Sequence, residues 1–201
     1  MRQTLFPDFH LILVPGLHDS SVGHWQSRWE RAHHLDRVRQ DDWDHPELVA
    51  WAARVSEARA GDPRPALLIA HSYGCLAAVH SMARDEHGLA GALLVAPADP
   101  DKFNVANQLP ATALPCPSIV VASTDDPWMA FDGAAGWAHA WGSELVNAGA
   151  LGHINGESGL GEWPAGWRHV QRLVDLAQER FQYLRYVNDP QSPTLTHGEA
   201  R

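Results

Sequence analysis

Short apolar runs alternate along this chain with stretches that have helical periodicity. The apolar runs predict strands at residues 9–14, 66–70, 90–96 and 118–122, and further strands are predicted at 36–40 and 143–148. The stretches between them predict helices at residues 23–34, 41–60, 73–86, 131–141 and 163–186. Strands that alternate with helices form a parallel sheet covered on both faces. The pattern therefore predicts the α/β class.

Two of the predicted helices carry further signals at an end or along one side. Asp44 and Glu47 have the spacing of a capping-box variant, and Pro46 suits a first helical turn. We therefore expect a helix that begins in this segment and ends near Ala60. The last helix carries apolar side chains three or four residues apart, which predicts a side that faces the core. These side chains are Trp163, Trp167, Val170, Val174, Ala177, Phe181 and Leu184.

Length and charge restrict the domain organisation and the partners. A chain of 201 residues is long enough for one domain with a full core. We expect residues 1–187 to form that domain and residues 188–201, which are polar and contain two prolines, to form a flexible tail. The net charge is −9, without a block of like charges. A nucleic-acid partner is disfavoured, because phosphate binding needs a concentrated basic face.

The chain also lacks the signals of membrane, secreted and metal-binding proteins. No apolar run approaches the roughly 20 residues of a membrane span. The first ten residues show no signal-peptide core, so a cytoplasmic location is expected. Two cysteines, Cys75 and Cys116, do not make a disulfide framework. The thirteen histidines include no metal-ligand spacing, so neither a metal nor an organic cofactor is expected.

A serine lies at the tight turn of residues 70–74, between an apolar strand and an apolar helix. The turn has the sequence Ala-His-Ser-Tyr-Gly and differs from the pattern Gly-x-Ser-x-Gly only at Ala70, which is still small. Such a turn presents the serine hydroxyl of a hydrolase at a helix N-terminus. The alternative is that Ser72 merely caps a core helix.

An acid and a histidine follow Ser72 in the order that a strand–turn–helix serine hydrolase requires. Asp125 and Asp126 follow strand 118–122, and His153 follows the last strand. Both positions lie at the carboxyl ends of strands, where parallel sheets bind their ligands. Asp126 is favoured over Asp125, because the loop can fold back there toward the histidine. The alternatives are a simple turn before Pro127 and a loop histidine that only packs.

Acyl transfer also requires backbone donors for the oxyanion that develops in the transition state. One donor is expected to be the N–H of Tyr73, the residue after the nucleophile. The second is expected from the loop after the first strand, where Leu17 N–H is the candidate. Gly16 would permit the backbone turn that aims this donor.

Several neighbouring residues have an open or non-catalytic interpretation. His18, His24 and Trp25 could line the mouth of the site, or they could have surface or core roles. His71 directly precedes the serine, so its side chain should point away from the hydroxyl and have a structural role. The acidic run at 41–44 is interpreted as helix capping rather than as a catalytic group.

With these motifs in view, the chain resembles the small α/β-hydrolases of the retinoblastoma-binding protein 9 / YdeN-like family. The matching stretches are Leu13-Val14-Pro15-Gly16, His24-Trp25 with Trp29, Asp42-Trp43, His71-Ser72-Tyr73-Gly74, Val95-Ala96-Pro97-Ala98-Asp99, Ser123-Thr124-Asp125-Asp126-Pro127, and Gly152-His153-Ile154-Asn155 with Gly159 and Trp163. The resemblance implies a reduced α/β-hydrolase fold without a large cap domain. It also implies a triad of Ser72, Asp126 and His153, with the acid directly before the proline.

The sequence therefore predicts a serine hydrolase that cleaves an ester, thioester or related bond of a small acyl compound. The reaction would pass through an acyl-enzyme on Ser72, as in carboxylesterases. Two alternatives stay open at this point: an acyltransferase with the same triad, and a binding or scaffold protein that keeps only the fold. Residues 98–117 are rich in proline and predict a connector or a small lid.

Overall fold

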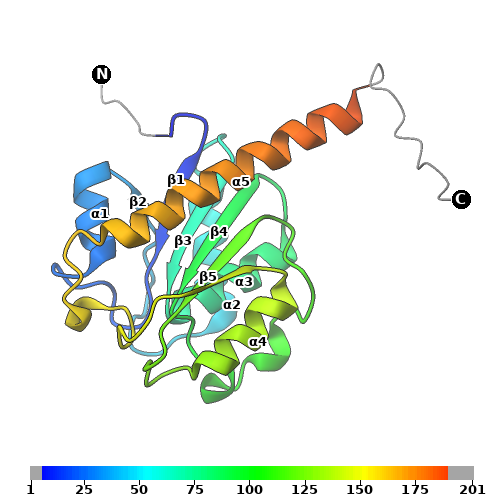
Figure 1. Ribbon diagram of the computed structural model, residues 1–201. Helices are drawn as coiled ribbons and strands as arrows, with labels where there is room; N and C mark the ends of the chain where they lie inside the picture. Colours follow the sequence, from blue (N-terminus) through cyan, green and yellow to red (C-terminus); the bar gives the residue numbers. More distant parts are fainter. Residues whose placement is uncertain (1–5, 190–201) are drawn as a thin grey trace, which may run out of the picture.

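The computed structural model describes residues 6–189, and a six-stranded sheet forms the centre of this part of the chain (Figure 1). The strands are β1 (His10–Val14), β2 (Asp36–Arg37), β3 (Ala66–His71), β4 (Leu89–Val95), β5 (Ser118–Ala122) and β6 (Glu144–Asn147). The helices are α1 (Trp25–His33), α2 (Leu48–Ala60), α3 (Tyr73–Arg84), α4 (Phe131–Trp141) and α5 (Pro164–Asn188). The strands are parallel and lie in the order β2-β1-β3-β4-β5-β6. The prediction of a mostly parallel α/β fold is confirmed.

Each face of the sheet carries its own apolar core. Helices α1 and α5 cover one face, where Trp25, Trp29 and Trp163 pack against one another and against the strands. Helices α2, α3 and α4 cover the other face, where aliphatic side chains pack together with Trp51, Tyr73 and Trp141. Figure 1 shows α5 running across the near face of the sheet. The strands β1, β3, β4 and β5 are buried between the two layers, which explains why they are continuous apolar runs in the sequence. The edge strands β2 and β6 are exposed or half-buried.

The strand register brings the carboxyl ends of the central strands to one edge. Val14 is paired with Ala70, and His71 is paired with Val95. At the far side of the sheet, Ala122 is paired with Asn147. The loops that follow these strands therefore begin side by side, and they contain the predicted site residues.

The predicted strand at 36–40 is too long. Only Asp36–Arg37 forms β2, and Val38 adds one more hydrogen bond, from its N–H to Leu13 O. The register explains this end: residues beyond Val38 would face Pro15, where β1 has already finished. Proline also has no N–H to offer to a neighbouring strand.

The predicted capping box at the start of α2 is wrong. The helix begins at Leu48, and its N-cap residue Glu47 makes no side-chain cap. The Asp42 carboxylate instead accepts hydrogen bonds from the N–H groups of Asp44 and His45, at 2.8 and 3.0 Å. This local turn competes with an earlier helix start, as short acidic side chains often do.

The core-facing side of α5 is correctly predicted for most of its length. Val170, Val174 and Ala177 are buried against the sheet. Gly91 of β4 leaves room for Leu173, because a Cβ at this glycine would lie 2.8 Å from the leucine Cδ1. Leu184 is 37% exposed, so its place in the stripe is wrong. The helix runs past the end of the sheet, so its periodicity continues beyond the surface against which it packs (Figure 1).

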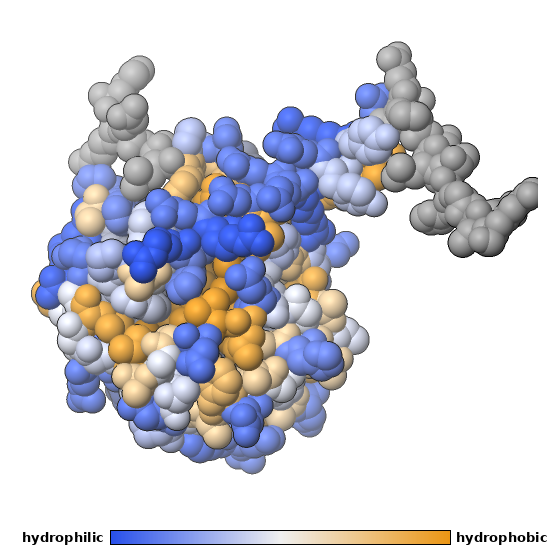
Figure 2. All heavy atoms as spheres, viewed as in Figure 1, coloured by the Kyte–Doolittle hydropathy of each residue, from blue (hydrophilic) through white to orange (hydrophobic). Residues whose placement is uncertain are grey.

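Figure 2 shows hydrophilic side chains along the outer side of α5 and apolar surface gathered below it.

In the segment 98–117 the chain forms two short 3-10 turns, η1 (Pro100–Phe103) and η2 (Ala106–Gln108), in place of a cap domain. None of the helices in residues 6–189 combines the length and apolarity needed to cross a bilayer. The predicted tail lies outside the described residues from position 190 onward.

Candidate active site

Ser72 occupies a strained turn between β3 and α3. Its backbone angles are φ 55° and ψ −128°, in a region that non-glycine residues rarely adopt. The turn is possible because two neighbours lack side chains. A Cβ on Gly74 would overlap the carbonyl oxygens of Val14 and Pro15, and one on Gly16 would lie 2.6 Å from the Ser72 Cβ. The close approach of β1 and β3 thus holds the serine at the carboxyl edge of the sheet.

The Ser72 hydroxyl does not cap α3, although the residue stands at the N-cap position. Its oxygen lies 2.9 Å from Nε2 of His153. The alternative in which the serine serves as a helix cap is therefore wrong. Strain of this kind costs roughly 1–3 kcal/mol and persists where the surrounding structure requires it.

His153 lies between Ser72 and Asp126. Its Nδ1 is 2.9 and 3.0 Å from the two carboxylate oxygens of Asp126, so this nitrogen is the donor and Nε2 is free to accept from the serine. The side chains of His153 and Asp126 are 9% and 3% exposed. Asp126 also accepts a hydrogen bond from the N–H of Trp128, at 2.8 Å. The carboxylate is thereby fixed in orientation and shielded from water.

Asp125 points to different partners. Its carboxylate accepts from the Ser123 hydroxyl and from the N–H of Gly152, both at 2.7 Å. The Ser123 hydroxyl, followed by the Gly152 N–H, lowers the pKa of Asp125. Asp125 therefore ties the loop after β5 to the loop after β6, and the structure brings Asp126, not Asp125, to the histidine.

The loop that carries His153 is held from below by buried side chains. Nε1 of Trp25 donates to the carbonyl oxygen of Ile154 at 2.8 Å, and Nε2 of His71 donates to the carbonyl oxygen of His153 at 2.9 Å. Burial, and then the neighbouring His24 and His153, lower the pKa of His71 well below its usual range. His71 is thus a neutral donor, in agreement with the structural role predicted for it.

The two predicted oxyanion donors flank Ser72. Tyr73 is the first residue of α3, where a backbone N–H has no acceptor within the helix. Leu17 follows Gly16 in the loop that touches the serine, and its N–H donates to no protein acceptor among the described residues. The Tyr73 side chain is buried in the core, and burial raises its pKa to about 12. Its backbone, not its phenol, is the part available to the site.

A cavity of about 580 Å³ opens above these residues. This volume is within the usual range for small-molecule sites, roughly 300–1,000 Å³. Its lining includes Ser72 and His153 together with Leu17, His18, Asp19, Ser21, His24, His71, Ala98, Phe103, Trp128, Asn155, Gly156 and Glu157. Of the three residues considered for the mouth, His18 and His24 line the cavity. The third, Trp25, lies in the core beneath it.

Sequence reasoning missed the apolar wall formed by Phe103 and Trp128. Phe103 comes from the turn η1 in the segment interpreted as a connector or lid, and Trp128 follows the acidic loop after β5. Lys102 joins the two segments, since its Nζ donates to the carbonyl oxygens of Pro127 and Trp128 at 3.2 and 2.7 Å. The only signal available in the sequence was the position of both segments after strand ends.

Comparisons with known proteins identify the family of this chain. The family model for serine hydrolases matches residues 11–172. The chain belongs to the serine hydrolase family. Among solved structures, a YdeN-like hydrolase from Pectobacterium atrosepticum is 41% identical, with a TM-score of 0.79 over 85% of this chain and 91% of that chain. The resemblance to YdeN-like hydrolases is confirmed.

Two more distant structures show the same fold. The ydeN gene product of B. subtilis is 20% identical, with a TM-score of 0.67 over 82% of this serine hydrolase and 98% of its own chain. A carboxylesterase from Bacillus cereus is 16% identical, with a TM-score of 0.56 over 83% and 90% of the two chains. A comparison with curated proteins finds no match.

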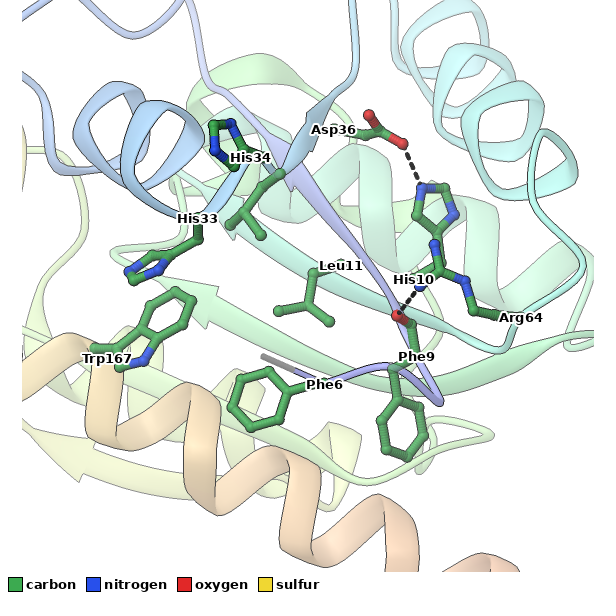
Figure 3. Close-up of a pocket in the computed structure, with 10 residues that line it drawn as sticks. Phe6, Phe9, His10, Leu11, His33, His34, Asp36, Arg64 and Trp167 are labelled. Atoms are coloured by element: carbon green, nitrogen blue, oxygen red, sulfur yellow. Dashed lines mark hydrogen bonds and ion pairs between the residues drawn. The ribbon is translucent and has the colours of Figure 1, made fainter. Parts of the chain in front are cut away.

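This serine hydrolase also has a much smaller cavity near the opposite edge of the sheet, at the start of β1 (Figure 3). Its volume is about 60 Å³, well below that of a usual small-molecule site. Figure 3 shows the His10 ring bonded to Asp36, at 2.7 Å, and the His33 ring stacked on Trp167, with centroids 3.9 Å apart. In residues 6–189 no group of three or more histidine, cysteine or acidic side chains could hold a metal ion.

Proposed function

We propose that this serine hydrolase cleaves an ester, thioester or related acyl bond of a small molecule, with residues 1–187 as one catalytic domain. Ser72 is the nucleophile, His153 the base and Asp126 the group that orients the base. The observation that carries the proposal is the state of Ser72: a strained residue at a helix start whose hydroxyl bonds His153 and not the helix. A serine with a merely structural role has no need of this strain.

The geometry supports a two-step acyl transfer. Nε2 of His153 takes the hydroxyl proton as the Ser72 oxygen attacks the substrate carbonyl, and the N–H groups of Leu17 and Tyr73 stabilise the oxyanion. The imidazolium then gives its proton to the leaving group, which departs and leaves an acyl-enzyme. In the second step His153 removes a proton from water as the water oxygen attacks the acyl carbon. The imidazolium then returns this proton to the Ser72 oxygen, the bond between Ser72 and the acyl group breaks, and the carboxylic acid product leaves.

Asp126 contributes orientation and charge to both steps. Its carboxylate holds Nδ1–H of His153, so the tautomer with a free Nε2 is favoured. It also stabilises the imidazolium that forms in each step. The mechanism requires neither a metal nor an organic cofactor.

The cavity supports a small acyl substrate. Leu17, Ala98, Phe103 and Trp128 give it one apolar wall, which suits an alkyl or aryl group. The segment 98–117 supplies two of these four side chains. It thus acts as a short lid that shapes the pocket. A carboxylesterase-like activity is the form of the reaction that this lining favours.

Labelling with a fluorophosphonate probe tests the nucleophile. The probe should label the wild-type protein and fail to label Ser72→Ala, because the reagent forms a covalent bond with an activated serine. Ser56→Ala is the matched control and should still be labelled. Ser56 lies in α2 and bonds the Ser81 hydroxyl, away from the cavity. Labelling that persists in Ser72→Ala would overturn the proposal.

A further inference from the structure

His24 is the N-cap residue of α1, and one of its two ring nitrogens already makes a hydrogen bond to the helix. Its Nδ1 accepts the N–H of Gln26 at 3.1 Å, so this nitrogen carries no proton. Burial, and then the charge of Arg37, lower the pKa of His24 to about 4. The ring is therefore neutral near pH 7. Its single proton must be on Nε2, which makes that nitrogen a hydrogen-bond donor.

This Nε2 donor is buried and meets no acceptor among the described residues. His24 is only 4% exposed, and its Nε2 is one of five buried side-chain atoms in residues 6–189 without a partner. An unmade bond of this kind costs roughly 1–3 kcal/mol. Of the residues that carry these five atoms, His24 is the one that lines the cavity of Ser72. The others are His10, Arg37, Arg59 and His80.

The His24 ring lies close to the reacting groups without belonging to them. Its centroid is 4.8 Å from that of His71, edge to face, and His71 is 4.9 Å from His153. Polar side chains from the loop before α1 and from residues 155–157 line the same cavity, and Gly156 lies close to Ser21 and His24. Apolar side chains such as Phe103 also line it. The lining thus combines apolar side chains with polar ones, and among the polar ones His24 is an unsatisfied donor.

We propose that Nε2–H of His24 donates a hydrogen bond to a second oxygen of the substrate, beyond the carbonyl that Ser72 attacks. The inference rests on the proposed function and defines its substrate class: acyl compounds with an uncharged keto, ether, hydroxyl or amide oxygen near the reacting carbonyl. The acceptor is uncharged because the donor is neutral and because Asp19 and Glu157 line the same cavity. His24 is a specificity-determining residue in this proposal, not a base.

Two substitutions separate this role from the helix cap. His24→Asn keeps an oxygen that can accept the Gln26 N–H, since asparagine is among the best N-cap residues, but it cannot reach the position of Nε2. His24→Gln extends an amide N–H to about the distance of Nε2 and should restore the bond. A thermal melt of both variants checks that the fold is kept.

The substrates are matched pairs of p-nitrophenyl esters. Within each pair one methylene group, at successive positions along the acyl chain, is replaced by an ether or keto oxygen. Wild type should prefer the oxygen-bearing member of at least one pair by about tenfold in kcat/KM, since a site built around a polar contact discriminates against an analogue that lacks it. His24→Asn should lose that preference through the oxygen-bearing ester alone, and His24→Gln should recover much of it.

The outcomes distinguish this inference from the proposed function. If wild type hydrolyses both members of every pair at equal rates, or if His24→Asn slows both members equally, the inference is overturned while the serine hydrolase assignment stands. If no ester is hydrolysed and no fluorophosphonate labels Ser72, the proposed function fails, and the inference fails with it.

Discussion

Of the four histidine–aspartate pairs in residues 6–189, two contain a histidine whose side chain is at most 9% exposed. These two lie at opposite edges of the same sheet, and only one of them has the surroundings of a catalytic site. At the carboxyl edge, His153 bonds Asp126 at 2.9 Å. At the amino edge, His10 bonds Asp36 at 2.7 Å. The two bonds are nearly equal in length. A histidine hydrogen-bonded to a carboxylate is therefore not by itself evidence of function.

The surroundings of the two pairs differ in three respects. The Asp126 side chain is 3% exposed, whereas that of Asp36 is 74% exposed, so water screens the second pair. In the first pair, His153 bonds the hydroxyl of the strained Ser72. In the second pair, both residues line a cavity of about 60 Å³. The larger cavity, of about 580 Å³, lies over the first pair. Together, strain, burial and space distinguish the pair that we propose to be catalytic from the other pair.

The strongest test of this comparison replaces the two histidines. His153→Ala should lower kcat for ester hydrolysis by about 10⁴-fold or more, because Ser72 loses the group that takes its proton. His10→Ala, the matched control, should leave kcat/KM within about twofold, since changes away from a site rarely affect it. Steady-state kinetics on one p-nitrophenyl ester measure both. A large loss of activity in His10→Ala, with the fold intact, would contradict the comparison.

The two aspartates provide a second test with a smaller effect. Asp126→Asn should lower kcat by about 10³–10⁴-fold, because the amide no longer holds the histidine in the tautomer that accepts from serine. Asp36→Asn should change neither kcat nor KM and should cost at most about 1 kcal/mol of unfolding free energy, as exposed ion pairs usually do. Kinetics and urea denaturation of both variants measure these effects. If Asp36→Asn were as inactive as Asp126→Asn, burial would not be the distinguishing feature.

The sequence predicted most of the sheet and helices and drew attention to Ser72, Asp126 and His153, because these features follow local rules. Apolar runs determine buried strands, and a serine after a strand, with a small residue two positions away on each side, predicts the tight turn. The choice between Asp125 and Asp126 needed the folded loops. Adjacent carboxylates there turn to different partners, Gly152 N–H and the His153 ring.

Features that depend on competition or on distant contacts were beyond sequence reasoning. The start of α2 was misplaced because an Asp42 turn competes with the helix at the same residues. Leu184 was misplaced because periodicity indicates which side of a helix is apolar, but not where its partner surface ends. The donor role of His71 depends on a residue 82 positions away. The donor role proposed for His24 depends on its N-cap bond, in which Nδ1 accepts the N–H of Gln26.

The smallest expected effect concerns a residue that links the two halves of the catalytic edge. His71 directly precedes Ser72, and its Nε2 donates to the carbonyl oxygen of His153, so it links the proposed nucleophile to the loop of the proposed base. His71→Leu removes the donor and should lower kcat by about 10–100-fold, the usual result of misplacing a reacting group by about 1 Å. KM should change little, because substrate contacts elsewhere in the cavity remain.

His71→Gln separates this positioning role from simple packing, because its amide N–H can reach the same carbonyl oxygen. Activity in His71→Gln should return to within about tenfold of wild type, and His71→Leu should stay lower at equal thermal stability. If kcat fell and KM rose together in both variants, His71 would only fill space. The loop of His153 would then be positioned by the hydrogen bond from Trp25 to Ile154. The turn of Ser72 and this loop would be joined only by packing.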